Sequence, residues 1–210
     1  MNINKLIVVV LLSFSFYNCK VTKGVENPKV KKAINLQKEV IDHPLFKKIL
    51  LELEQEGAID WSEGRTSSIQ EDLSNYESNT HWLLEQFKKK RGYHKDVVFL
   101  WRKFNPFSKT KAATYPCKDS TKLNKWRLKR DKYSILNTLI HERVHSFCHI
   151  HPRNKQTKRE NLCDAAYIAG DLSEAIISNK MGIKERRMSL PICPALIQKI
   201  DDYELVKIIK

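Results

Sequence analysis

Apolar residues recur at helical spacing in several parts of the chain and predict helices there. The predicted helices cover residues 45–56, 81–90, 164–178 and a segment that begins at Ser134. A continuous apolar run over 97–104 predicts a strand, and a weaker alternation over 121–128 predicts a second one. Residues 62–79 are polar and are expected to form loops. These patterns together predict an α+β fold with packed helices and a short sheet.

The helix that begins at Ser134, its expected N-cap, combines a buried stripe with polar residues that can carry chemistry. The stripe consists of Leu136, Ile140, Val144 and Phe147. Beside it lies the run His141-Glu142-Arg143-Val144-His145, which has the pattern H-E-x-x-H. Residues four apart share one face of a helix, so both imidazoles can reach one metal ion. The glutamate can then take a proton from a water at that metal, which predicts a zinc site of the hydrolytic type.

A catalytic zinc usually has three protein ligands, and the sequence leaves the third ligand open. The eleven residues from His141 to His151 resemble the metzincin metallopeptidase signature H-E-x-x-H-x-x-G-x-x-H, with Cys148 at the glycine position. In that family the glycine ends the helix in a left-handed conformation. The resemblance implies that His151 is the third ligand. A counterpart of that family's methionine beneath the metal would be Met181, although a methionine after a helix is more often part of the core.

A second resemblance implies a different third ligand. The run Asp164-Ala165-Ala166-Tyr167 is similar to the D-x-x-Y portion of aspzincin peptidases. In that family the aspartate binds the metal and the tyrosine assists at the oxyanion, which implies Asp164 as a ligand and a catalytic role for Tyr167. His149 and Glu174 are further alternatives.

Both resemblances imply a small zincin-like domain over residues 41–210, with an H-E-x-x-H active-site helix and an edge strand above the metal. The implied function is that of a zinc metallopeptidase acting on peptide or protein substrates. Glu142 would be the general base, Tyr167 would donate to the oxyanion, and Asn124 or its neighbours would bind substrate along the edge strand. The alternative is a non-catalytic zinc-binding lipoprotein of the cell envelope that acts as a binding or interaction module.

The N-terminal residues predict export and lipidation. Lys5 precedes a run of apolar and hydroxyl residues over 6–17, which is shorter than the roughly twenty residues of a membrane span. Cys19 follows directly and resembles the acylated cysteine of a bacterial lipoprotein. We therefore expect a signal peptide over 1–18 and a lipid anchor at Cys19 that holds the protein on a membrane of the bacterial envelope, facing the periplasm or the exterior. The polar segment 19–40 contains Pro28 and is expected to be a tether.

Export also determines how the cysteines and the charge are interpreted. The remaining cysteines are Cys117, Cys148, Cys163 and Cys193, which predict two disulfides in an oxidising compartment. A bond between Cys148 and Cys163 would join the metal-binding helix to the segment that carries Asp164, whereas pairing of either one with Cys117 or Cys193 is the alternative. The net charge of +14 is explained most simply by a soluble, lysine-rich surface. If the charge serves a partner, anionic lipid or acidic cell-wall polymers fit an envelope protein better than nucleic acid, which is not expected.

Overall fold

The computed structural model describes residues 22–23, 26–61, 73, 75–89, 98–101, 107–151 and 160–209. These residues form an α+β domain, as predicted. Its helices are α2 (Pro28–Ile41), α3 (Pro44–Gln55), α5 (Asn79–Lys88), α6 (Lys132–Ser146), α7 (Ala165–Lys180) and α8 (Pro194–Asp202). Its strands are β1 (Thr22–Lys23), β2 (Val98–Trp101), β3 (Ala112–Thr114), β4 (Thr121–Asn124), β5 (Glu185–Arg187) and β6 (Lys207–Ile209).

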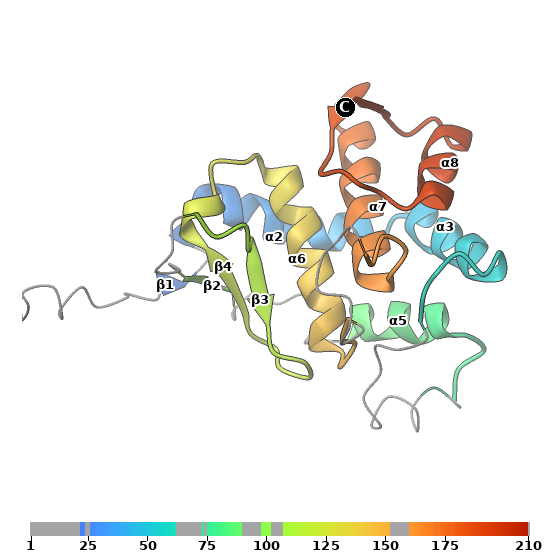
Figure 1. Ribbon diagram of the computed structural model, residues 1–210, viewed down its shortest axis with the longest axis horizontal. Coiled ribbons are helices and arrows are strands. Elements are labelled where there is room, and N and C mark those ends of the chain that lie inside the picture. Colours follow the sequence, from blue (N-terminus) through green and yellow to red (C-terminus); the bar gives the residue numbers. More distant parts are fainter. Residues whose placement is uncertain are drawn as a thin grey trace, which may run out of the picture.

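The larger sheet has four strands in the order β1-β2-β4-β3, and a parallel pair of β5 and β6 forms the smaller sheet. Within the larger sheet β2 is parallel to β4, while β1 and β3 are antiparallel to their neighbours. Figure 1 shows α6 at the centre of the molecule, with the larger sheet on one side and α7 on the other. The edge strand β3 therefore lies beside the helix that carries the H-E-x-x-H run.

Helix α6 begins two residues before the expected N-cap. Asp131, not Ser134, is the N-cap, because the Asp131 carboxylate accepts hydrogen bonds from the backbone N–H groups of Tyr133 and Ser134. The predicted apolar stripe is confirmed, since all four of its side chains are buried. Ile135 and Leu139 are buried as well, because α2, α7 and β3 pack around α6 on several sides.

The close packing of α7 on α6 depends on Gly170. A Cβ atom at this position would lie 2.8 Å from the backbone oxygen of Asn137 and 3.4 Å from the Cβ atom of His141. Only a residue without a side chain lets the two backbones approach this closely. Helix α7, predicted over 164–178, thus lies directly against the part of α6 that carries the first histidine.

The prediction of a tether over 19–40 is wrong from residue 28 onward. Pro28 occupies the first turn of α2, where proline is favoured, and Asn27 caps that helix through its side-chain oxygen. Apolar residues at helical spacing face inward from α2 and pack on α6. These buried residues are Val30, Ala33, Ile34, Leu36, Val40 and Ile41. The helical stripe was present in the sequence, but the interspersed lysines and the proline obscured it.

The remaining predicted elements are found close to their expected positions. Helices α3 and α5 confirm the predictions over 45–56 and 81–90, and β2 lies within the predicted strand 97–104. The predicted strand 121–128 ends early, because the Asn124 side chain accepts a hydrogen bond from the N–H of Trp126 and starts a 3-10 turn, η3 (Lys125–Arg127). The predicted signal peptide and Cys19 lie outside the described residues, as does most of 62–79. Among the described residues no helix is both long and apolar enough to cross a membrane.

Two disulfides form, as predicted, and they join Cys117 to Cys148 and Cys163 to Cys193. The suggested bond between Cys148 and Cys163 is therefore wrong. Cys148 follows α6 beside the connection between β3 and β4, where the backbone N–H of Cys117 donates to the carbonyl of His145. Cys163 instead lies just before α7 and bonds to the residue that caps α8. Each disulfide thus links a segment next to the site to a different neighbouring element.

Candidate metal centre

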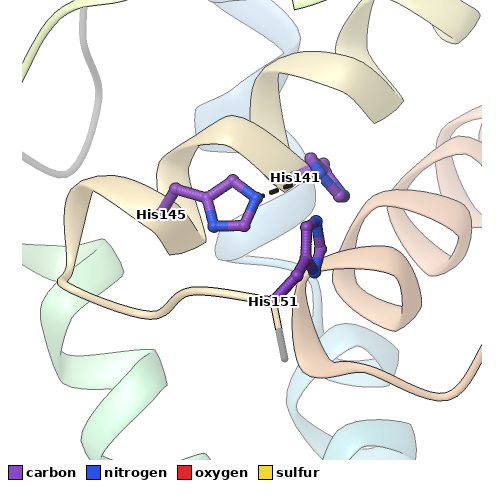
Figure 2. Close-up of side chains that lie close together, drawn as sticks. All are labelled: His141, His145 and His151. Carbon is purple, nitrogen blue, oxygen red and sulfur yellow. Dashed lines mark hydrogen bonds between the residues drawn. The ribbon is translucent and has the colours of Figure 1, made fainter. Parts of the chain in front are cut away.

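Three imidazoles converge beside α6. His141 and His145 lie one helical turn apart on α6, and their Nε2 atoms are 3.2 Å from each other. His151 joins them, and one ring nitrogen from each of the three residues lies within 4.8 Å of the other two. Figure 2 shows the two helical rings meeting, with His151 directed toward them from the segment that follows the helix. These three residues are close enough to hold one metal ion.

The chain reverses after α6 at Cys148, which takes over the conformational role of glycine in the metzincin signature. Cys148 has φ 72°, in the left-handed region, and its N–H donates to the carbonyl of His145 at 3.0 Å. A left-handed backbone at a residue other than glycine costs on the order of 1–2 kcal/mol. The disulfide from Cys148 to Cys117 joins this turn to the loop between β3 and β4. His151 therefore returns to the helix even though the glycine is missing.

The surroundings of His145 fit a metal-binding role. Nδ1 of His145 lies 2.8 Å from the carbonyl oxygen of His149, so this nitrogen is the N–H donor and Nε2 keeps its lone pair. Burial lowers the pKa of His145 to about 3, which keeps this imidazole neutral. Neutral imidazoles that are oriented through their second nitrogen are ligands typical of zinc and similar transition metals. The donor set thus fits such an ion.

Asp164 lies behind the imidazoles and is not one of the converging ligands. Its Oδ2 atom is 2.8 Å from Nε2 of His149, and its Oδ1 atom is 3.4 Å from Nδ1 of His151. Oδ1 also accepts the N–H of Ala166 and so caps α7. Burial acts to raise the pKa of Asp164, but the hydrogen bonds to His149 and His151 keep it well below its usual range. Asp164 is thus placed to orient two histidines as a carboxylate.

Neither of the other alternative ligands joins the three rings. His149 is buried, and its Nε2 atom bonds to Asp164. Its own backbone carbonyl accepts from His145, and its ring lies 6.2 Å from that of Trp61. Glu174 binds Asn137 and Arg186. Met181 ends α7, fourteen residues after Tyr167, which corresponds to about 20 Å along a helix. The suggestion that Met181 lies beneath the metal is therefore wrong.

Glu142 faces a cavity next to the imidazoles. The cavity has a volume of about 820 Å³, and its walls include residues 109–114, the three histidines, Tyr167 and residues 189–191. Only 6% of Glu142 is exposed, and its Oε2 atom has no hydrogen-bond partner in the described part of the chain. Burial raises the pKa of Glu142 to about 7, although hydrogen bonds from Thr114 on β3 act in the opposite direction. A buried carboxylate thus borders the same space as the converging nitrogens.

Tyr167 forms the other wall of the site. Its ring stacks on that of His151, with centroids 4.9 Å apart and planes at 9°, and its centroid is 4.4 Å from that of His141. Burial raises the pKa of Tyr167 to about 12, and the charge of Asp164 acts in the same direction. The phenol therefore keeps its proton and can donate a hydrogen bond.

Asn124, which was expected to bind substrate, is buried and donates instead to the carbonyl of Thr110.

A buried polar network supports α6 from the side of α7, and no pattern in the sequence predicts it. Asn137 lines the cavity and donates to Asp171 at 2.9 Å and to Glu174 at 2.8 Å. Glu174 in turn accepts hydrogen bonds from Arg186, which also binds the N-cap residue Asp131 at 2.7 Å. The helical spacing of Asn137 and His141 indicates a shared face, but no sequence pattern connects either one to Arg186.

Comparisons with protein-family models, with curated proteins and with solved structures found no match for this chain. A functional assignment therefore depends on the chemistry of the site. That chemistry consists of three converging imidazoles, a buried carboxylate and a protonated tyrosine around one cavity.

Proposed function

We propose that this protein is a membrane-anchored, zinc-dependent hydrolase, and specifically a metallopeptidase. The observation that carries the proposal is the convergence of His141, His145 and His151 within 4.8 Å beside the buried carboxylate of Glu142. Three imidazole ligands leave a position open for reaction, which is typical of catalytic zinc sites and not of closed structural sites.

When bound, zinc polarises a carbonyl group and lowers the pKa of a water molecule toward neutrality. The role of Glu142 is proton transfer. Its carboxylate would accept a proton from the attacking water and would later return a proton to the leaving amine. Glu142 lines the cavity beside the three histidines, and its Oε2 atom has no hydrogen-bond partner among the described residues, which supports this role.

Two further parts of the cavity suit a peptide substrate. Tyr167 keeps its proton and lies against the rings of His141 and His151, so its hydroxyl can stabilise negative charge on a substrate oxygen. Strand β3 pairs only with β4 in the described sheet and lines the cavity. An extended peptide can pair with such an edge through its backbone.

The cellular location belongs to the same proposal. A lipid at Cys19 would hold the mature protein on an envelope membrane, and the disulfides Cys117–Cys148 and Cys163–Cys193 suit an oxidising compartment. Such an enzyme would act on peptides or proteins near that membrane.

The proposal is tested by comparing the wild type with Glu142→Gln, and with Glu185→Gln as a control at an exposed glutamate. Each protein is analysed for metal content after purification without chelators and for cleavage of a mixed peptide library. We expect about one zinc per chain in all three proteins, and loss of cleavage only in Glu142→Gln. Equal cleavage by wild type and Glu142→Gln would refute the role of Glu142. A zinc-loaded wild type that cleaves nothing would favour a non-catalytic binding module.

A further inference from the structure

Two aromatic side chains are exposed at one end of the larger sheet. Phe107 is 85% exposed and precedes β3, while Trp126 is 46% exposed and lies in the turn η3 that follows β4. Their segments lie side by side, because the Arg127 guanidinium donates to the carbonyl of Ser108 at 2.8 Å and to that of Phe107 at 3.3 Å. Large apolar side chains that stay exposed next to each other commonly mark a surface that contacts a partner.

All charged residues in these two segments are basic. Residues 107–111 and 124–130, which we call the aromatic–basic end, contain six lysines and arginines and no acidic residue. The basic residues are Lys109, Lys111, Lys125, Arg127, Lys129 and Arg130. Arg130 is directed inward and donates to the carbonyl of Ser134, and Lys111 donates to Ser189 beside the cavity. Lys109 and Lys129 are exposed. This end of the sheet therefore presents positive charge around two aromatic rings.

The strand register shows where the N-terminal part of the chain enters the sheet. Thr22 pairs with Leu100 and Lys23 pairs with Phe99, so β1 runs opposite to β2, and β2 runs parallel to β4. Thr22, the first residue of β1, therefore lies toward the end of the sheet where β4 leads into η3, which is the aromatic–basic end. Cys19 precedes Thr22 by three residues, which can span at most about 11 Å.

We infer that the aromatic–basic end lies against the surface of an anionic phospholipid bilayer. Tryptophan and phenylalanine partition into the interface between headgroups and acyl chains, and lysine and arginine are attracted to anionic headgroups. A lipid at Cys19 would hold this end of the sheet within roughly one screening length of the membrane, about 8–10 Å. The position of Cys19 and the positive charge of the aromatic–basic end thus both favour an anionic membrane as the partner of this surface.

This orientation is tested with the full chain on vesicles of phosphatidylglycerol and brominated phosphatidylcholine, with tryptophan emission as the readout. Bromine quenches only those indoles that enter the bilayer. All proteins compared carry Trp101→Phe, because Trp101 pairs with Asn124 at the same end of the sheet. In this background we expect quenching when Trp126 is present and its loss in Trp126→Phe. In the Trp126→Phe background, Phe107→Trp should restore quenching. Tyr115→Trp is the matched control, because Tyr115 is 70% exposed but follows β3 at the opposite end of the sheet, so a tryptophan there should stay unquenched.

The same vesicles separate the surface from the anchor and from the metal site. Quenching should weaken when phosphatidylglycerol is replaced by a zwitterionic lipid or when salt is raised, and it should not change when a chelator removes metal. Equal quenching of tryptophans at 107 and 115 would overturn the inference, as would quenching that does not depend on anionic lipid. Attachment to vesicles without quenching at 107 or 126 would also overturn the inference. The partner of the aromatic–basic end would then be an acidic polymer and not a bilayer. Failure of the metal to bind would contradict only the proposed hydrolase function.

Discussion

The carboxylate of Asp164 lies 3.4 Å from Nδ1 of His151 and accepts the N–H of Ala166 through the same oxygen atom. One side chain thus contacts an imidazole of the candidate metal centre and caps α7. Two resemblances suggested competing third ligands, and in the folded protein the two residues have different tasks. His151 is directed toward the other rings, and Asp164 supports it from behind.

This relationship predicts different effects for substitutions at the two positions. His151→Ala should weaken zinc binding most, because it removes a ligand. Asp164→Ala should weaken it by about 10–100-fold, as is usual when the partner of a metal-bound imidazole is lost. Asp164→Asn is the matched control, since asparagine still caps the helix. Competition with a chelating dye measures the affinities. Unchanged zinc binding in His151→Ala, combined with loss in both Asp164 variants, would make Asp164 the ligand.

The turn at Cys148 predicts an effect of glycine once the disulfide has been removed. Loss of the Cys117–Cys148 bond, which closes a loop of 31 residues, should lower the free energy of unfolding by about 3–4 kcal/mol. Cys148 has a positive φ, so Cys117→Ser with Cys148→Gly should be more stable than Cys117→Ser with Cys148→Ser by about 1 kcal/mol. Urea unfolding measures the difference. Equal stability of the two double variants would contradict the conformational role of residue 148.

Gly170→Ala tests the close packing of α7 on α6. Alanine favours a helix over glycine by about 1 kcal/mol, which by itself would stabilise α7. The added Cβ would lie 2.8 Å from a backbone oxygen of Asn137, which cannot move without shifting α6. We therefore expect a net destabilisation of about 1–3 kcal/mol in thermal or urea unfolding. Zinc affinity should fall as well, because His141 lies beside the contact. A variant that is as stable as the wild type would show that the helices can separate without cost.

Asp131 should make part of the stability depend on pH. Burial acts to raise the pKa of Asp131, but the hydrogen bonds from Arg186 and from the N–H groups of Ser134 and Tyr133 lower it below its usual value. A carboxyl group with a lowered pKa stabilises the folded state at neutral pH, and this contribution is lost as the pH falls through the pKa of the folded state. Asp131→Asn keeps the cap and loses the ion pair, whereas Asp131→Ala loses both and should cost about 1 kcal/mol more.

Urea unfolding from pH 7 down to pH 3 measures this dependence. The difference in unfolding free energy between wild type and Asp131→Asn should shrink below about pH 4, where an aspartate becomes protonated. A difference that stays constant over this range would mean that the charge of Asp131 does not stabilise α6.

The proposed lipid anchor predicts a change of location for Cys19→Ser. Substitution should prevent acylation, so the variant should leave the membrane fraction or accumulate unprocessed. Fractionation of cells, together with the mass of the mature N-terminus, measures the outcome. Wild-type processing and membrane association of Cys19→Ser would contradict the lipoprotein proposal. Lys20→Ser is a suitable neighbouring control, because it leaves the cysteine intact.

The sequence alone determined those features that depend on residues within one or two helical turns. The spacing of His141 and His145, the buried stripe of α6 and the helices α3, α5 and α7 follow from local periodicity, which backbone geometry imposes wherever the chain is helical. The eleven-residue signature also placed His151 within reach of the other two histidines, and the even number of cysteines indicated two disulfides. The lysine-rich helix α2 was missed, because lysines separate its apolar residues and the helix begins at a proline.

Only the tertiary structure decided how distant groups combine. Arg186 reaches Asp131 across 55 residues, and Asn137 reaches Glu174 across 37, so no local pattern could connect them. The position of His151 beside the other two rings, the position of Asp164 behind them and the pairing of the cysteines likewise depended on how α6, α7 and the β3–β4 connection pack together. The physical reason is that side-chain periodicity reports which face of an element is buried, whereas the partner on that face is determined by the packing of the whole core.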